Sequence, residues 1–174
     1  MQFRLIEENE LVDFTAFAKA TFIRTYAHLN NPIHFQQYIE EAFTIERITK
    51  EWLNPDSYFY WKKEKEIPIA YVKLNRGLAQ TDPCLPASLE IERIYVDHKF
   101  KRKGLGSSMI KLSIEKAASL NLEWVWLGVW KKNPDAIEFY QNQGFEIFSE
   151  HIFRIGEDDQ LDYLMRRSVK QYNY

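Results

Sequence analysis

A short basic run that contains glycines lies where the chain could bind a phosphate. It is Lys101-Arg102-Lys103-Gly104-Leu105-Gly106, followed by Ser107, and it stands between a predicted strand and a predicted helix. The first N–H groups of a helix have no intrahelical partner and attract anions, and glycines allow the main chain to approach a phosphate closely. The run therefore predicts a phosphate cradle, with a solvated surface loop as the alternative. It lacks the further glycine of a dinucleotide fingerprint and the Gly-Lys-Ser/Thr of a nucleoside triphosphate loop.

A second group of residues recurs at helical offsets further along the chain. Asn133, Ala136 and Tyr140 are separated by three and four positions, so they share one face of a helix. The amide of Asn133 can bond a ligand, Ala136 leaves room beside the backbone, and the phenol of Tyr140 can donate a proton. These residues predict one wall of a binding site. The alternative is that Tyr140 packs beneath a sheet as an ordinary core residue.

The strand predicted before the basic run changes its apolar phase part of the way along. Its apolar positions are Leu89 and Ile91 at first and Ile94 and Val96 afterwards, so the phase slips beside Glu92. A β-bulge inserts one extra residue in this way and aims side chains at active sites. A strand covered on both faces, where no clean alternation is expected, is the alternative.

Apolar periodicities and boundary residues predict the elements that must position these motifs. We expect strands at residues 3–5, 58–61, 67–74, 89–96, 124–129, 145–148, 151–155 and 161–166, and helices at residues 11–22, 35–43, 45–53, 104–119 and 133–144. Residues 89–129 then form a strand, a helix and a second strand, which predicts parallel strands joined by a right-handed crossover. The basic run begins the helix of that unit.

Composition restricts the class of protein and the kinds of partner. The chain has 174 residues, 45% of them hydrophobic and 28% charged, so we expect one folded domain over residues 1–174. A formal net charge of −2 provides no basic field for nucleic acid or an anionic membrane, so neither is an expected partner. No apolar stretch of membrane-spanning or signal length follows the N-terminus, so a cytoplasmic location is expected. The oligomeric state stays open, with a homodimer as one option.

Cysteine and histidine usage predicts neither disulfide nor metal chemistry. Cys84 is the only cysteine, which excludes an internal disulfide and a cysteine metal cluster. The histidines, at positions 28, 34, 98 and 151, show no metal-ligand spacing. We therefore predict no metal, and we interpret Cys84 as an incidental thiol.

Together and in this order, the motifs resemble the GNAT superfamily of acetyl-coenzyme A-dependent N-acetyltransferases. The resemblance rests on the strand from Leu89 to Val96, the run from Lys101 to Gly106, and Asn133-x-x-Ala136-x-x-Phe139-Tyr140-x-x-x-Gly144-Phe145. It extends over most of the chain, and the run from Leu127 to Asn133 is similar to the PaiA-type polyamine acetyltransferases. Lys101 departs from the Gln or Arg that is more frequent in the superfamily, but it keeps a hydrogen-bond donor.

The resemblance implies a fold of the α/β (α+β) class, with a mixed, mainly antiparallel sheet that is splayed at its centre and flanked by helices. Acetyl-coenzyme A enters the splay as a co-substrate. Main-chain groups of Ile94, Tyr95 and Val96 pair with its pantetheine arm as an added strand would, and Asn133 and Ala136 contact the far side of the arm. The residues implied at the pyrophosphate are Lys101, Arg102, Lys103, Gly104, Leu105, Gly106 and Ser107.

The implied chemistry is direct attack of an amine on the thioester in a ternary complex, without a covalent enzyme intermediate. Tyr140 matches the position that protonates the departing thiolate. An alkyl amine with a pKa of ~10.4 is mostly protonated at neutral pH, so a base or a water chain must remove a proton first. Glu92 is the candidate base because it lies where the strand phase slips. A charge pair with Arg93 is the alternative.

The expected acceptor is a small-molecule amine, with a polyamine such as spermidine or spermine as the first choice. The candidate substrate-binding residues are Phe22, Tyr26 and Glu92, because the family covers its acceptor site with this helical region and aromatic rings can hold cations. A protein amine or another small amine is the alternative within the same chemistry. An inactive module that senses acyl-coenzyme A or binds a partner is the alternative from another class, and the presence of both Tyr140 and Glu92 argues against it.

Overall fold

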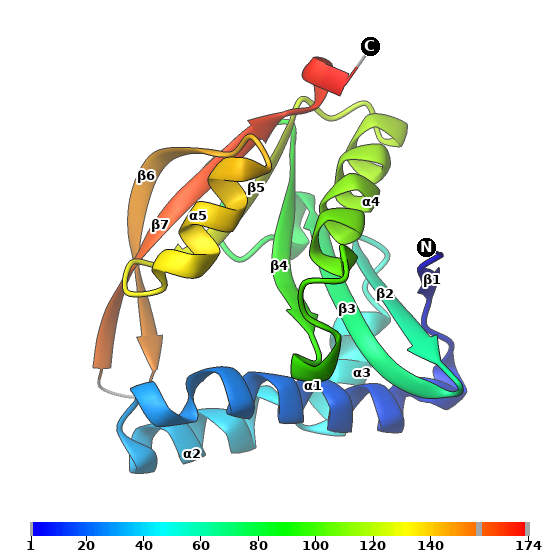
Figure 1. Ribbon diagram of the computed structural model, residues 1–174, viewed down its shortest axis with the longest axis vertical. Helices are drawn as coiled ribbons and strands as arrows, with labels where there is room; N and C mark the ends of the chain where they lie inside the picture. The colour runs from blue at the N-terminus through cyan, green and yellow to red at the C-terminus, as the bar shows by residue number, and fades with distance from the viewer. Residues whose placement is uncertain (1, 156–157, 173–174) are drawn as a thin grey trace.

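A sheet of seven strands runs through the centre of the computed structural model, which describes residues 2–155 and 158–172 (Figure 1). Its strands are β1 (Arg4–Leu5), β2 (Ser57–Glu64), β3 (Ile67–Arg76), β4 (Ser88–Val96), β5 (Trp124–Trp130), β6 (Glu146–Ile155) and β7 (Asp158–Ser168). They lie in the order β1-β2-β3-β4-β5-β7-β6. β4 and β5 run parallel and the other neighbouring strands run antiparallel, which confirms the prediction of a mixed, mainly antiparallel sheet.

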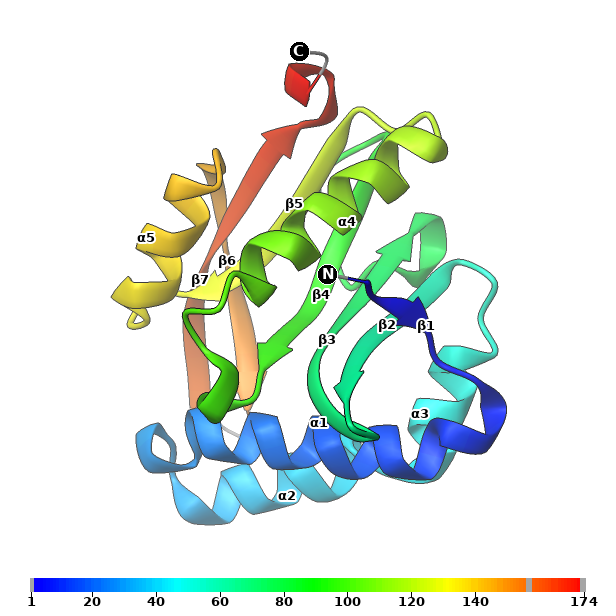
Figure 2. The ribbon, with the colours of Figure 1, turned by 45° about the vertical axis from the view of Figure 1, so that its right-hand side comes forward.

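Helices cover both faces of this sheet (Figures 1 and 2). They are α1 (Leu11–Tyr26), α2 (Pro32–Ala42), α3 (Ile45–Trp52), α4 (Leu105–Ser119) and α5 (Pro134–Asn142). α1, α2 and α3 pack on one face, and α4 and α5 pack on the other. Within the described residues, none of these helices combines the length and the apolar character that crossing a bilayer requires.

Two hydrophobic cores form because the central strands are buried on both faces. On β3, Tyr71 packs into the core beneath α1, α2 and α3, whereas Val72 and Leu74 pack into the core beneath α4 and α5. Alternate side chains of a strand point to opposite faces, so a strand covered on both sides needs apolar residues at neighbouring positions. Helices and buried side chains therefore cover both faces of the sheet.

The sheet opens at its centre because β4 and β5 pair along only part of their length. Their register runs from Ser88 opposite Trp124 to Glu90 opposite Trp126 and then ends. Beyond Glu90, β4 keeps only β3 as a neighbour, and beyond Trp126, β5 keeps only β7. The two strands diverge from that point, as Figure 2 shows, and the predicted splay of the sheet is confirmed.

The phase slip predicted beside Glu92 is a β-bulge. Lys73 of β3 lies opposite Arg93, but the next residue of β3, Leu74, lies opposite Ile91. Glu92 is therefore the extra residue of β4, which has no Cα partner on β3. The bulge falls where β4 loses its pairing with β5, so it marks the beginning of the splayed half.

One part of the predicted strand pattern is wrong. Residues 145–148 and 151–155 were expected to form separate strands, but residues 146–155 form the single strand β6. The register with β7 shifts between Ile147 and Ser149, so Phe148 is an extra residue that interrupts the alternation. The segment between the strands expected at residues 151–155 and 161–166 lies partly outside the described residues.

Candidate active site

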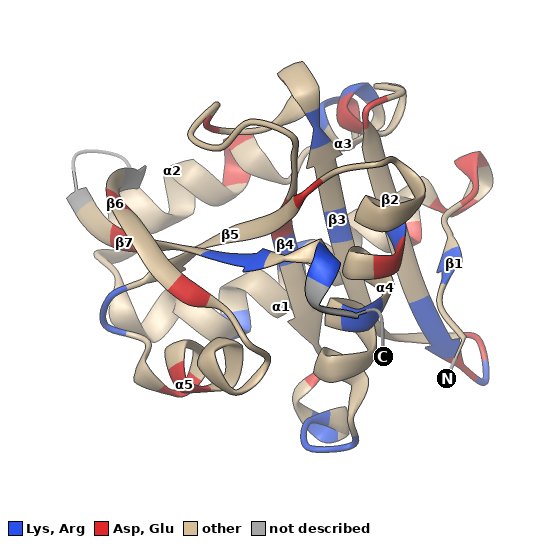
Figure 3. Ribbon diagram, turned by 90° about the horizontal axis from the view of Figure 1, so that it is seen from above, with Lys and Arg blue, Asp and Glu red and all other residues tan. Residues whose placement is uncertain are grey.

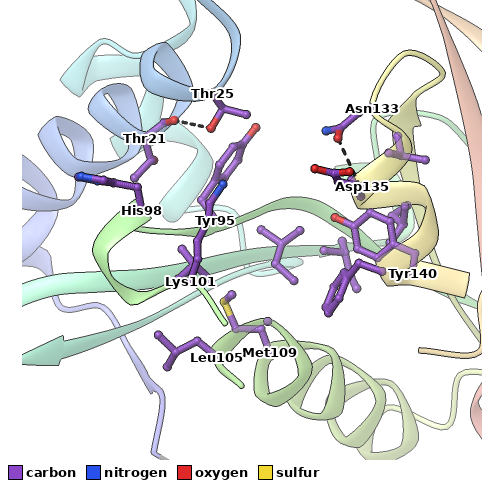
Figure 4. Close-up of a pocket in the computed structure, with 18 of the residues that line it drawn as sticks. Thr21, Thr25, Tyr95, His98, Lys101, Leu105, Met109, Asn133, Asp135 and Tyr140 are labelled. Carbon is purple, nitrogen blue, oxygen red and sulfur yellow. Dashed lines mark hydrogen bonds between the residues drawn. The ribbon is translucent and has the colours of Figure 1, made fainter. Parts of the chain in front are cut away.

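A cavity of about 1020 Å³ lies where β4 and β5 separate (Figure 4). It is lined by the C-terminal part of α1, the splayed halves of β4 and β5, the loop before α4, the first turn of α4, and one face of α5. The cavity brings together most of the residues predicted to bind the donor, which are Ile94, Tyr95, Val96, Lys101, Arg102, Gly104, Leu105, Gly106, Ser107, Asn133, Ala136 and Tyr140. Segments that are distant in the sequence therefore form one site.

The N-terminus of α4 presents unpaired backbone N–H groups to this cavity. Gly104 occupies the cap position with φ of 77° and makes no side-chain cap hydrogen bond. The first intrahelical bond joins Ser108 N–H to the Gly104 carbonyl, so the amides of Leu105, Gly106 and Ser107 precede the helical hydrogen-bond ladder. Such a helix end carries a partial positive charge and binds anions.

Basic residues of the loop before α4 strengthen this anion site, and Figure 3 shows them on the loop that leads into the helix. Lys101 and Arg102 line the cavity. Lys103 does not line it, because its ammonium lies 4.8 Å from the ring centroid of Phe100. The uncapped helix end and the two lining cations suit the pyrophosphate of coenzyme A, and Lys103 is placed to contribute at longer range.

The glycines of the predicted cradle have different structural roles. At Gly104, φ lies in the left-handed region, and a Cβ added there would meet no atom within 4 Å. A Cβ at Gly106 would lie 3.0 Å from Cζ of Phe139. Gly106 is therefore needed for the close contact of α4 with α5, whereas Gly104 shapes the turn and leaves the amides open.

The sequence around α5 folds as the cap signals predict. Asn133 Oδ1 accepts a hydrogen bond of 3.3 Å from Ala136 N–H, and Pro134 occupies the first helical turn. Gly144, with φ of 81°, follows the end of the helix. This capping fixes the face that carries Ala136 and Tyr140 toward the cavity.

Tyr140 is a buried residue whose hydroxyl points into the cavity (Figure 4). Its ring packs edge-on against Phe139 and Phe145, with centroid distances of 5.3 and 6.0 Å. Burial raises the pKa of the Tyr140 phenol above its ordinary value, and the nearby phenol of Tyr26 adds to this effect. Tyr140 therefore stays protonated at neutral pH and can act as a proton donor.

The splayed half of β4 offers an open edge to an extended ligand. Ile94, Tyr95 and Val96 line the cavity and pair with β3 on one side only. Backbone groups on the side toward β5 are left for another partner, which is the arrangement that an added strand uses. This edge fits the amide-containing pantetheine arm of coenzyme A.

The carboxylate of Glu92 borders the cavity but is held by an ion-pair network. It lies 2.5 Å from Nζ of Lys73, accepts a 2.5 Å hydrogen bond from Asn75, and lies 3.0 Å from Nη2 of Arg93. Glu51 also contacts both Lys73 and Arg93, at 2.8 and 3.0 Å. Burial acts to raise the pKa of Glu92, but the charges of Arg93 and Lys73 outweigh it, so the pKa is lowered. The predicted charge pair with Arg93 is thus present.

Glu90, two positions earlier on β4, is buried beside this network. Its carboxylate accepts hydrogen bonds from the N–H and hydroxyl of Thr81, and from Asn75 at 3.3 Å. Burial and the negative charge of Glu92 raise the pKa of Glu90 to about 7. Glu90 does not line the cavity, so its contacts serve to hold the loop between β3 and β4.

The two aromatic residues expected at the acceptor have different positions. Tyr26, at the end of α1, lines the cavity and interacts with Tyr95. Phe22, one turn earlier, is 8% exposed and stacks on Phe35 with a centroid distance of 5.8 Å. Phe22 does not line the cavity, because its ring belongs to the core between α1 and α2.

Two neighbouring residues of β5 and β7, one of which lines the cavity, were not predicted from the sequence. Gly128 lines the cavity and is exposed, although Leu127 and Val129 on either side are buried. A lone glycine inside an apolar strand is a signal of close approach that could have drawn attention to it. Asp162 of β7 lies beside Gly128, since a Cβ at position 128 would be 3.6 Å from Oδ2 of Asp162. The sequence contains no local signal for this proximity.

The described part of the chain contains no group of three or more His, Cys, Asp and Glu side chains placed to hold a metal ion. Cys84 is a free thiol outside the cavity, and burial raises its pKa to about 11. A thiol of this kind is a poor nucleophile at neutral pH, because the thiolate is the reactive form.

Comparisons with known proteins agree with this geometry. The profile of the acetyltransferase (GNAT) family matches residues 23–145. An uncharacterized N-acetyltransferase from the pepI 3′ region of Lactobacillus delbrueckii subsp. lactis is 34% identical over 164 residues, which cover 94% of this chain and 95% of that protein. The spermine/spermidine N(1)-acetyltransferase of Bacillus subtilis strain 168 is 33% identical over 61 residues, which cover 34% of this chain and 40% of that protein.

Solved structures show the same fold. The PaiA N-acetyltransferase of Thermoplasma acidophilum, in complex with coenzyme A, superposes with a TM-score of 0.77 at 17% identity, over 96% of this chain and 98% of that chain. The resemblance expected from the motifs is confirmed, and with it the use of acetyl-coenzyme A as co-substrate. The chain belongs to the GNAT family of acetyl-coenzyme A-dependent N-acetyltransferases.

Proposed function

We propose that this chain acetylates a primary amine of a small polyamine, in the class of spermidine and spermine. The cavity supports the proposal because its two ends differ in chemistry. One end has the uncapped N-terminus of α4 with Lys101 and Arg102, which suits an anionic donor. The other end has the phenol of Tyr26 and the carboxylate of Glu92, which suit a cation. The partial similarity to a spermine/spermidine acetyltransferase points the same way.

The acetyl donor would be held along the free edge of β4. Amides of the first turn of α4 bind its pyrophosphate, and the backbone of residues 94–96 bonds its pantetheine arm. Asn133 and Ala136 close the site from α5. The group supplies a thioester whose carbonyl carbon accepts an amine. The chain's task is then to orient this carbonyl and to manage two protons.

Tyr140 serves the leaving group in this proposal. Its hydroxyl faces the cavity and its raised pKa keeps it protonated. The C–N bond forms as the C–S bond breaks, and the departing sulfur takes the phenolic proton. Water in the open cavity then restores the phenol. The buried phenol of Tyr140, whose hydroxyl faces the cavity, is the single observation that carries the catalytic assignment.

The acceptor must lose a proton before it attacks. A carboxylate accepts a proton more readily as its pKa approaches that of the donor, and the ion pairs of Glu92 lower its pKa. Glu92, the candidate base from the sequence, is therefore a weak proton acceptor, although its negative charge can attract a cationic amine. A water chain or a second carboxylate of higher proton affinity is the competing arrangement.

An acceptor screen tests the proposed function. The protein is incubated with acetyl-coenzyme A and, in turn, spermidine, spermine, a monoamine and a peptide with a free N-terminus, and the acetylated product is identified by mass spectrometry. We expect singly acetylated spermidine and spermine to form fastest. Preferential acetylation of the peptide would instead support a protein amine as acceptor, and a monoamine that reacts as well as spermidine would also contradict the polyamine proposal.

A further inference from the structure

We propose that Asp162 binds the ammonium form of the acceptor above the open backbone of Gly128 and takes its proton before attack. This inference rests on the proposed N-acetylation of a cationic amine, but it does not require that amine to be spermidine. It assigns a catalytic role to a residue of β7 that lies outside the motifs of the sequence. Asp162 does not line the cavity itself, but its carboxylate lies beside Gly128, which does, so the missing side chain at Gly128 opens the carboxylate to an amine in the cavity.

The sheet places Asp162 at this position. Asp162 lies opposite Trp130 of β5 and opposite His151 of β6, so β7 holds it between two strands. Residues that are opposite in an antiparallel pair share a face, and alternate residues of a strand share that face too. Gly128 and Trp130 therefore face the same side as Asp162. The distance of 3.6 Å from a notional Gly128 Cβ to Oδ2 of Asp162 confirms that they are neighbours.

The absent side chain at Gly128 creates the space for a ligand. Gly128 is exposed and lines the cavity, whereas Leu127 and Val129, which also line it, point to the opposite face of β5 and are buried. It also belongs to the half of β5 that has separated from β4. An ammonium group placed over this glycine would contact the Asp162 carboxylate directly. Any larger residue would put carbon atoms where the amine must lie.

Asp162 also interacts with a residue that lines the cavity. The pKa of Tyr26 is raised mainly by burial, and also by its interaction with the Asp162 carboxylate. The pKa of Tyr140 is raised by burial and by its interaction with Tyr26. The phenol of Tyr26, which lines the cavity, therefore interacts electrostatically with both Asp162 and Tyr140.

The charge environment leaves Asp162 free for a ligand. Among the described residues, no hydrogen-bond donor and no lysine or arginine contacts its carboxylate. His151 faces it from β6, but Nδ1 of His151 lies 3.4 Å from the carboxylate of Asp82. Tyr26 faces Asp162 from α1. Lys132 follows β5 in the chain, and its ammonium lies 5.8 Å from the ring centroid of Trp130. An arriving ammonium group would be the first strong partner.

Proton affinity favours Asp162 over Glu92 for this step. Burial raises the pKa of Asp162 to about 6, and His151 lowers it slightly. Glu92 has a pKa below its ordinary value because of Arg93 and Lys73. A higher pKa makes a carboxylate the better proton acceptor, so transfer from the ammonium to Asp162 is more favourable than transfer to Glu92.

The protons and bonds of the step balance. The ammonium transfers one proton to Asp162 and becomes a neutral amine, whose lone pair attacks the thioester carbonyl carbon. The C–N bond forms, the C–S bond breaks, and the sulfur takes a proton from Tyr140. The second proton of the amine nitrogen then passes through water to the phenolate of Tyr140, and Asp162 releases its proton to solvent. The net products are the acetylated amine, free thiol and one proton.

The replacement of Asp162 by asparagine tests this assignment. Asp162→Asn keeps the shape and removes the charge, so the thermal shift produced by acetyl-coenzyme A should persist. We expect kcat/KM for the best amine of the acceptor screen to fall on the order of 100-fold at neutral pH. The wild-type decline of kcat/KM below pH about 6 should disappear with the carboxylate. Glu150→Gln, a carboxylate paired with Lys131, serves as the control and should keep both rate and profile.

A second variant supports the test from the side of the ligand. Gly128→Ala adds a methyl group at ordinary contact distance from Asp162, so the fold tolerates it. We expect it to raise KM for the amine roughly 10- to 100-fold while the affinity for coenzyme A is unchanged. Asp162→Asn with a normal rate and a normal acidic decline would overturn the assignment, whatever the identity of the amine. Failure of polyamines in the screen would instead overturn only the proposed substrate class.

Discussion

Lys73 Nζ lies 2.5 Å from a carboxylate oxygen of Glu92, the extra residue that the bulge inserts into β4. Their side chains are 4% and 15% exposed, so this is a largely buried ion pair. The pair connects the start of the splay to β3 and, through Glu51, to α3. The ion pair therefore gives Glu92 a structural role at the cavity wall. Measurements can separate this role from a role of Glu92 in proton transfer.

Replacing Glu92 by glutamine should destabilise the protein. The change removes the negative charge that compensates the buried charges of Lys73 and Arg93. Removal of one partner of a buried ion pair lowers the free energy of unfolding by ~3 kcal/mol. The folded pKa of Glu92 is lowered, so its contribution to stability is present above the unfolded pKa near 4.5 and is lost as pH falls through the folded pKa. Urea unfolding at pH 7 and at pH 4 measures both effects.

The same variant separates the two candidate bases. If Asp162 takes the proton, the Glu92→Gln variant keeps the decline of kcat/KM near pH 6. This holds even if kcat/KM of the variant at neutral pH is lower than that of the wild type. Loss of that decline in Glu92→Gln, together with its persistence in Asp162→Asn, would assign the base to Glu92.

Replacing Tyr140 by phenylalanine should reduce turnover far more than donor binding. The change deletes one hydroxyl and leaves the ring in its contacts with Phe139 and Phe145. A general acid contributes on the order of 100- to 10,000-fold to rate, so kcat should fall within that range. Calorimetry with coenzyme A should give an unchanged Kd. Turnover that is preserved across pH would show that Tyr140 is a packing residue.

Gly104 offers a test of the anion cradle with a matched control. Gly104→Val places a branched side chain beside the amides of α4 and should abolish the thermal shift produced by acetyl-coenzyme A. The positive φ of 77° also costs about 1 to 2 kcal/mol for a residue with a Cβ. Gly77→Val imposes a similar strain at φ of 54° in a turn outside the cavity, and it should keep the shift. Equal shifts in both variants would remove the cradle from the site.

The buried carboxyl of Glu90 should make stability depend on pH. Its pKa rises from 4.5 to about 7 through burial and the charge of Glu92. Because the folded pKa is the higher one, the contribution is present below pH 4.5 and is lost as pH rises through about 7. The change amounts to about 3 kcal/mol. Thermal unfolding between pH 5 and pH 8 measures this slope, which should be flatter in Glu90→Gln; an equal slope in both proteins would contradict the assignment.

Local sequence signals predicted the elements that carry the proposed donor-binding residues. Asn133, Pro134 and Gly144 mark the bounds of α5 through cap and stop preferences that act over a few residues, and the structure confirms them. The bulge at Glu92 was visible because a slip of phase changes which residues are apolar. Such features depend on neighbours in the chain, so the sequence carries them directly.

The proposed acceptor half depends on long-range contacts that local patterns do not contain. Asp162 reaches Gly128 only because β7 inserts between β5 and β6 in the sheet order. Phe22 was expected at the acceptor, but the packing of α1 on α2 turns its ring into the core. Lys103 was expected at the phosphate, but its side chain lies over Phe100. Helical or strand periodicity cannot distinguish these positions from their neighbours.

The preference for a polycation, measured against ionic strength, tests the central claim most directly. We predict a higher kcat/KM for spermidine than for a monoamine of similar length, because the remote amines of spermidine can be held by carboxylates and aromatic faces while the reacting amine is oriented. The advantage should shrink as salt rises, since partly exposed charges are screened over about 10 Å at 0.1 M ionic strength. Equal kcat/KM values for the two amines at low and at high salt would contradict polyamine acetylation.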